Sequence, residues 1–289
     1  IQIGVMVGAA RAANILEDWP AQEVQPTPNP EKPSKPPEIE VISPYFSVGR
    51  QNLSDGKVLE VDIISGPPSS PPEWEIQQLD STSLREDAVL LPYFPSYNWV
   101  FGCSAVSGAM IAGYYDNHGY PYMYTGPTNA GAMPITDSGW PIWDDSVGDS
   151  YPSNPLVASS AGLDGRTDDG SIEDYWVSYG SKQNDPYISG GWPQHDWGSA
   201  IGDYMKTSQS NYDNNDGSSA FWNYGGATKL HCSAMTADVR LNDATYGRKL
   251  FYEARGYSVD TCFNQKTDNQ AVGGFSLEDF QAEINAGHP

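Results

Sequence analysis

The sequence predicts an α+β fold, with strands in its first part and helices after them. Residues 39–48 and 57–64 have partly alternating apolar side chains, which is typical of strands, and the pair Asp55-Gly56 between them is a turn signal. Residues 103–116 have the apolar spacing of a helix. A capping box, Ser276-Leu-Glu-Asp279, predicts a last helix over 277–286. These observations place antiparallel strands and several helices in one chain.

Further elements follow in chain order. Residues 87–94 are apolar and predict a strand that enters the core, while 171–179 and 197–208 predict two short helices within a Gly-, Asp- and Tyr-rich region. Residues 235–255 predict a helical region, and 259–263 predict a strand. We find no internal repeat of the solenoid type.

The helix predicted over 103–116 has one stripe of larger side chains, at spacings of three and four residues. Gly108 and Gly113 lie beside it, and each weakens helix propensity by roughly 1 kcal/mol relative to alanine. Such glycines are expected where another element packs closely on the helix. The stripe consists of Cys103, Val106, Met110 and Tyr114.

Composition divides the chain into three segments. Residues 1–37 form an apolar arm and a linker with six prolines between positions 26 and 37. Residues 38–75 contain the predicted β-hairpin, either an accessory module or part of a pro-segment. Residues 76–289 form the large domain. The chain does not begin with Met, which we interpret as a processed product or a piece of something longer.

Charge and hydropathy exclude several classes of partner. The net charge of −22 argues against binding to nucleic acid or to an anionic membrane surface. No apolar run approaches the roughly 20 residues needed to span a bilayer. Such an acidic chain is typical of an extracellular or salty setting. We therefore expect a secreted or cell-surface protein.

The cysteine count is odd. Cys103, Cys232 and Cys262 are the three cysteines, and a secreted protein is expected to form one disulfide and keep one thiol. Cys232 and Cys262 lie close together in the chain and are the natural pair. The alternative is three reduced, mostly buried cysteines.

Cys103 lies at the predicted start of a helix, where unpaired backbone N–H groups and the positive end of the helix dipole converge. That environment favours a thiolate, which is the nucleophilic form of cysteine. The same N–H groups can stabilise the oxyanion of an acyl intermediate. A catalytic nucleophile and a buried structural cysteine both remain open.

The stretch 98–116 resembles the bacterial papain-like cysteine peptidases of the bacteriocin-processing type, peptidase family thirty-nine in the broad sense. The similarity extends over roughly 85–289, and the stretches 164–176 and 190–205 resemble secreted members that have a long insert. The matching motif consists of Asn98, Trp99, Gly102, Cys103, Ala105, Ala109, Met110, Tyr114, Tyr115 and Asp116.

The resemblance implies a papain-like fold, with a cysteine-bearing helix followed by an antiparallel sheet that is incomplete in this chain, and a long, loop-rich insert. It implies Cys103 as the nucleophile. The Asn98 side chain and the Cys103 backbone N–H would be the donors of the oxyanion hole. In the family the general-base histidine follows a segment like 283–289, and His288 stands where relatives have another basic residue. We therefore expect the base beyond Pro289, and this chain alone to be inactive.

Other candidate groups lie in the insert. His195, between Gln194 and Asp196, is a candidate base within the chain, and its alternative is a structural or surface histidine. No histidine or cysteine cluster has the ligand spacing of a zinc site, so no metal is expected there. A calcium site or an ordinary Asx turn fits the group Asp213, Asn215 and Asp216.

Two functional hypotheses follow. The first is a secreted cysteine peptidase that cuts peptide or protein substrates through a thioester at Cys103. The second is a non-enzymatic extracellular adhesin or surface-filament subunit on the same fold, which self-associates through residues 1–20. Neither requires a cofactor.

Overall fold

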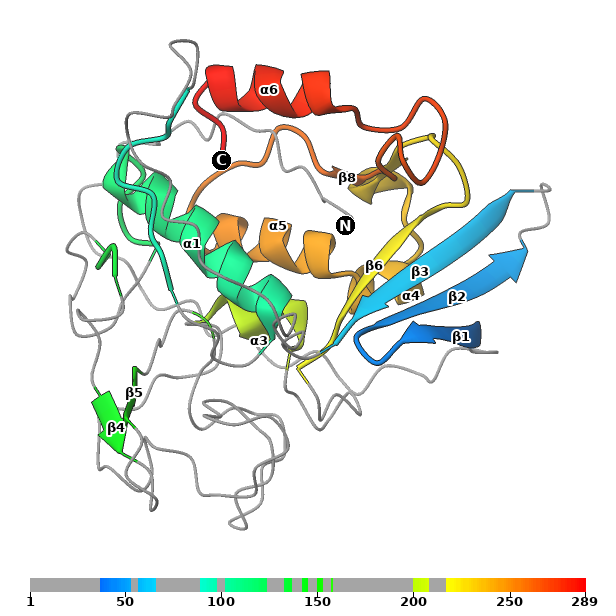
Figure 1. The fold of residues 1–289 in the computed structure, drawn as a ribbon, viewed down its shortest axis with the longest axis horizontal. Helices are drawn as coiled ribbons and strands as arrows, with labels where there is room; N and C mark the ends of the chain where they lie inside the picture. The colour runs from blue at the N-terminus through cyan, green and yellow to red at the C-terminus, as the bar shows by residue number, and fades with distance from the viewer. Residues whose placement is uncertain are drawn as a thin grey trace, which may run out of the picture.

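The computed structural model describes residues 37–52, 57–65, 89–97, 102–123, 133–136, 142–144, 150–152, 157, 200–207 and 217–289. Helices α1 and α5 lie beside an antiparallel sheet, and α6 runs along the edge of the molecule next to the chain end (Figure 1). The α+β class predicted from the sequence is confirmed. Within these residues no helix is long and apolar enough to cross a membrane.

The main sheet has the strand order β1-β2-β3-β6, and all its pairs are antiparallel. Its strands are β1 (Glu38–Ser43), β2 (Phe46–Asn52), β3 (Val58–Ile64) and β6 (Ser219–Tyr224). The prediction of a single strand over 39–48 is wrong. The chain turns at Pro44 and Tyr45, where the Tyr45 N–H donates to Ser43 Oγ at 3.3 Å. The turn satisfies the Tyr45 N–H locally, and proline has no N–H to contribute to a strand.

Strand β6 joins two parts of the chain that are far apart in the sequence. It pairs with β3 along its whole length, so that Glu60 lies opposite Asn223 and Val61 opposite Trp222. The predicted hairpin 38–65 is therefore part of a larger sheet. That sheet contains strands from the second and third segments of the chain.

The main core forms around α1 (Cys103–Asn117), α3 (Ile201–Met205) and α5 (Ala244–Ala254). The predicted helix over 103–116 is confirmed. Ala105, Ala109 and Ala112 are completely buried, because small side chains allow neighbouring elements to approach the helix. A Cβ on Gly108 would lie 3.0 Å from Ile201 Cδ1, which explains the glycine in the middle of a helix.

A second cluster packs on the other face of the sheet around the Cys232–Cys262 disulfide. Its residues come from β7 (Leu230–His231), the 3₁₀ turn Cys232–Ala234, α4 (Ala237–Asn242) and other segments, including Cys262. Cys262 directly precedes β8 (Phe263–Asn264). The helical region predicted over 235–255 is two helices, because Asp243 ends α4 and caps α5. The strand predicted over 259–263 is shorter and lies further along the chain, at β8.

The remaining elements are α6 (Leu277–Asn285), with the predicted capping box at Ser276 and Asp279, and the pair β4 (Ile142–Asp144) and β5 (Ser150–Pro152). The strand predicted over 87–94 is wrong for its described part, 89–94, which has no strand. The helix predicted over 197–208 is reduced to α3 within the described residues 200–207. The helix predicted over 171–179 lies outside the described residues.

Candidate functional site

Cys103 is the first residue of α1 and is partly exposed. Gly102 precedes it with φ of 92°, a backbone conformation that favours glycine. A Cβ on Gly102 would lie 2.2 Å from Thr207 Cγ2 and 2.9 Å from the Gly217 carbonyl oxygen. The Gly-Cys pair therefore lies where the end of α3 and the entry to β6 meet. This close approach explains why glycine precedes the cysteine.

Thr207 is a further polar group at this junction. It is buried, and its hydroxyl has no hydrogen-bond partner within the described part of the chain. Its methyl group lies against Gly102. The hydroxyl oxygen is one of several buried side-chain N or O atoms without a hydrogen-bond partner in the described residues, so by itself it does not indicate a functional site.

The cysteine pairing expected from the sequence is confirmed. Cys232 and Cys262 form a disulfide that joins the end of β7 to the segment before β8. Cys103 is the free cysteine. It is therefore the one thiol of this chain that can react as a nucleophile without prior reduction.

Two opposing effects act on the Cys103 thiol. Burial raises its pKa, because a thiolate is less well solvated inside the protein. Hydrogen bonds from Ser104, a hydrogen bond from the Cys103 backbone and the positive charge of Arg248 lower the pKa, but burial outweighs them. The described surroundings thus leave the thiol in need of a base that takes its proton.

Arg248 reaches this end of α1 from α5. Its Nη2 donates a hydrogen bond to the Ser104 carbonyl oxygen at 2.9 Å. The guanidinium carbon lies 5.8 Å from the centre of the Phe221 ring on β6, a cation–π distance. Sequence reasoning missed Arg248, because it lies in a different predicted helix from Cys103 and has no local motif.

The histidines of the described region do not lie beside Cys103. His118 follows α1 and stacks on Tyr114, with ring centres 4.0 Å apart. His288 pairs with Glu283 at 2.6 Å, and the neighbouring Gly287 carbonyl accepts from the Tyr114 hydroxyl. Tyr114 lies about 16 Å along the helix from Cys103, at 1.5 Å of rise per residue. His231 packs against Phe263 in the disulfide cluster.

The other predicted site residues cannot be placed. Asn98, the expected side-chain donor of the oxyanion hole, and His195, the candidate base within the chain, lie outside the described residues. The same holds for Asp213, Asn215 and Asp216, the group with calcium-like spacing. Among the described residues, no group of three or more His, Cys, Asp or Glu side chains is arranged to hold a metal ion.

Asp116, the last residue of the motif, has a structural role. Its carboxylate accepts from the backbone N–H groups of Met123 and Met133, at 3.0 and 2.7 Å. Burial raises the pKa of Asp116, and these two hydrogen bonds oppose the rise. The side chain therefore ties two connecting segments to the end of α1.

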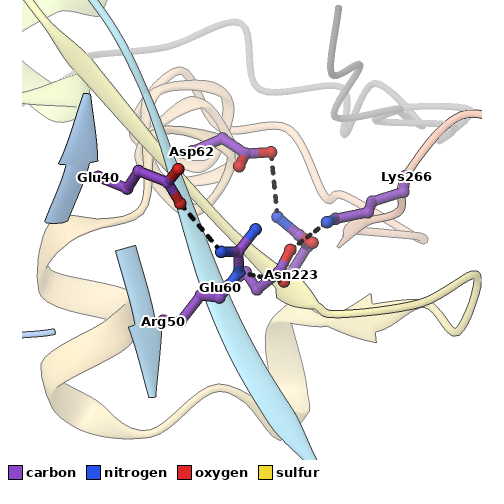
Figure 2. Close-up of polar contacts among 6 residues, drawn as sticks. All are labelled: Glu40, Arg50, Glu60, Asp62, Asn223 and Lys266. Atoms are coloured by element: carbon purple, nitrogen blue, oxygen red, sulfur yellow. Dashed lines mark hydrogen bonds and ion pairs between the residues drawn. The ribbon is translucent and has the colours of Figure 1, made fainter. Parts of the chain in front are cut away.

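A second group of ionisable residues lies on the sheet (Figure 2). Glu60 on β3 pairs with Lys266 and, at 3.0 Å, with Arg50 on β2, while Asn223 donates to Asp62 at 3.4 Å. Burial acts to raise the pKa of Glu60, but the hydrogen bonds from Lys266 and Arg50 outweigh it and lower that pKa. Burial raises the pKa of Asp62 to about 6.

We interpret this second group as structural. Glu60 is 6% and Asp62 2% exposed, which leaves little surface for a substrate. Glu60 and Asp62 alternate with apolar neighbours along one strand, so they share a face of the sheet. That alternation is the sequence signal that could have revealed the group.

No protein-family model, no curated protein and no solved structure matches this chain.

Proposed function

We propose that the protein is a secreted papain-like cysteine peptidase, or a close variant of one, with Cys103 as its nucleophile. The observation that carries the proposal is the position of the free thiol. Cys103 is the first residue of the 15-residue helix at the centre of the core, and a glycine precedes it.

The chemistry at this position suits acyl transfer. The Cys103 thiolate attacks the carbonyl carbon of a peptide bond, and the N–H groups at the start of α1 stabilise the oxyanion that forms. The amine leaves with a proton from the general base, and a thioester remains on Cys103. Water activated by the same base then releases the carboxylic acid and restores the thiol.

The proposal requires a general base and a second oxyanion donor. Asn98 lies five positions before Cys103 and is the proposed side-chain donor. His195 is the candidate base of the present sequence. Such a base is needed because burial raises the pKa of the Cys103 thiol.

The disulfide supports an extracellular location. Disulfides persist in oxidising compartments and are rare in the cytosol. Cys232–Cys262 closes a loop with a sequence separation of 30 residues in the described part of the large domain.

The test uses the full-length gene product and a mixture of unstructured peptides, with cleavage followed by mass spectrometry. Cleavage that disappears in both Cys103→Ala and Cys103→Ser supports the proposal. Ser107→Ala, on the exposed side of the same helix, is the matched control and should cleave normally. Cleavage that survives in Cys103→Ala, or no cleavage by the native protein, contradicts it.

One observation favours a second candidate, a surface protein that assembles through its sheet. Strand β1 lies at the edge of the main sheet and exposes Ile39, Val41 and Ile42 at 46, 71 and 53%. An exposed apolar edge strand can pair with a strand of another chain.

Sedimentation of Val41→Lys tests this candidate, since a charge on the edge opposes strand pairing. Val272→Lys, at a fully exposed position away from the sheet, is the control. Assembly that Val41→Lys alone abolishes supports the candidate. A native protein that stays monomeric at every concentration measured by sedimentation excludes this candidate.

A further inference from the structure

We infer that Arg248 is a positioning residue for the reaction of Cys103, and that its guanidinium supplies a fixed positive charge which favours the thiolate at the start of α1. The inference rests on the proposed function of Cys103. It adds a residue from a distant part of the sequence to the proposed site.

The path of the Arg248 side chain supports this role. Its Nε lies 3.2 Å from the position that a Cβ on Gly108 would take, and its Nη2 donates to the Ser104 carbonyl at 2.9 Å. Ser104 and Gly108 are four residues apart and share a face of the helix. The guanidinium therefore lies along α1 over its first turns, and glycine at 108 leaves it room.

The hydrogen bonds of Arg248 are incompletely satisfied. Its Nε is enclosed by protein, yet it has no hydrogen-bond partner within the described residues. Arginine stays protonated at any ordinary pH, so a positive charge is fixed at this place. A buried polar atom without a partner requires an explanation, and a charge held for the thiolate provides one.

Other ionisable groups lie on the elements packed against this end of α1. Burial lowers the pKa of Arg248, and the negative charges of Asp243 and of a Cys103 thiolate oppose that effect. Burial raises the pKa of the nearby Tyr252, which keeps its hydroxyl neutral. None of these groups adds a positive charge next to the thiol, whereas the charge of Arg248 lowers the pKa of Cys103. On α3 and immediately after it, the ionisable groups are Asp203, Tyr204 and Lys206, and none of them is among the causes that shift the pKa of Cys103.

The positive charge of Arg248 stabilises the Cys103 thiolate, because water screens the attraction between the two charges less inside the protein than at its surface. Burial alone would hold Cys103 as a neutral thiol. A cation within the protein offsets part of that penalty before any base acts. Arg248 would thus make it easier for the general base to remove the proton of the Cys103 thiol.

The test measures the rate at which iodoacetamide alkylates Cys103 between pH 5 and 10 in the full-length gene product. We expect Arg248→Gln to raise the apparent thiol pKa by about one unit, which lowers the thiolate fraction at pH 7 about tenfold. Arg248→Lys keeps the charge and should restore most of the rate. Lys249→Gln, which removes a neighbouring charge paired with Glu253, should change nothing.

An unchanged pH profile in Arg248→Gln overturns the inference, and so does an equal shift in Lys249→Gln. If Arg248→Gln fails to fold, Gly108→Ala decides, because the added methyl displaces the guanidinium without removing its charge. Gly108→Ala should also raise the apparent pKa of the Cys103 thiol, and an unchanged pKa contradicts the inference. Alkylation is read independently of cleavage, so a shifted thiol pKa without Cys103-dependent cleavage would contradict the proposed function alone.

Discussion

Asn264 donates a hydrogen bond from Nδ2 to Oδ2 of Asp243 at 2.6 Å and thereby joins β8 to the start of α5. The same carboxylate accepts from the Trp222 N–H of β6 at 2.8 Å and, through Oδ1, from the Tyr246 N–H at 2.7 Å. Asp243 therefore fixes α5 relative to two strands. Because Arg248 lies in α5, Asp243 also determines where the guanidinium meets α1.

Asp243→Ala should be strongly destabilising. Three donors would lose their acceptor in a buried site, and each such loss costs about 1–3 kcal/mol. We expect a total of about 3 kcal/mol or more in urea unfolding at pH 7. Asp238→Ala, at an exposed position in the first turn of α4, is the matched control and should cost less than about 1 kcal/mol. Equal losses in the two variants would contradict the role given to Asp243.

Gly108→Ala should destabilise the protein, although alanine is more favourable than glycine inside a helix by roughly 1 kcal/mol. The added methyl meets Ile201 Cδ1 at 3.0 Å and Arg248 Nε at 3.2 Å. Overpacking of this kind typically costs about 1–3 kcal/mol. Thermal unfolding of Gly108→Ala measures this cost, and Ser107→Ala, at an exposed neighbouring position on the same helix, is the control. A Gly108→Ala protein more stable than the native one would show that this packing is not tight.

Lys266→Met should be more harmful than Arg50→Met at pH 7. Lys266 is mostly buried beside Glu60, whereas Arg50 is exposed. Removing Lys266 leaves a buried carboxylate poorly compensated, which costs about 3 kcal/mol. The cost should shrink as pH falls below about 4.5, because the pKa of Glu60 is lowered in the folded state and its ion pairs are lost only as pH falls through that lowered pKa. Urea unfolding at pH 7 and at about pH 3 measures the change, and equal effects of the two variants at pH 7 would contradict the assignment.

Asp62→Asn should gain stability relative to the native protein as pH rises. Burial raises the folded-state pKa of Asp62 from 3.8 to about 6. Between these values the unfolded state loses its proton first, so this group lowers native stability with rising pH, by up to about 3 kcal/mol. Asparagine does not titrate. Urea unfolding from pH 4 to 7 should show the difference growing in favour of Asp62→Asn, whereas a constant difference would contradict the raised pKa.

Local patterns predicted much of the fold. Helix α1, the capping box of α6 and the strand over 58–64 follow from apolar spacing or cap chemistry near each residue. The break at Pro44 was missed because apolar residues lie on both sides of it, Ile39 and Val41 before it and Phe46 and Val48 after it, as they would in one strand. The separation of α4 from α5 was missed because the helical pattern continues through Asp243, whose acceptor role depends on strands elsewhere in the chain.

The candidate site was only partly predictable. Cys103 was found because a cysteine at a helix start has a chemistry that depends on nearby backbone. Arg248 and Thr207 could not be found in this way, since each reaches the site through tertiary contacts with α1. The pairing of β3 with β6 across the sequence was likewise invisible to local patterns. Long-range contacts of this kind leave no signal in short stretches of sequence.

The reactivity of Cys103 tests the central claim most directly. The rate of alkylation by iodoacetamide is measured at pH 6 on the full-length gene product and compared with a model thiol, with peptide mapping to locate the label. We predict that Cys103 reacts at least about tenfold faster than the model thiol, as expected of a cysteine activated by a base and a cation. Labelling of Cys103 no faster than the model thiol would contradict the assignment of Cys103 as a nucleophile.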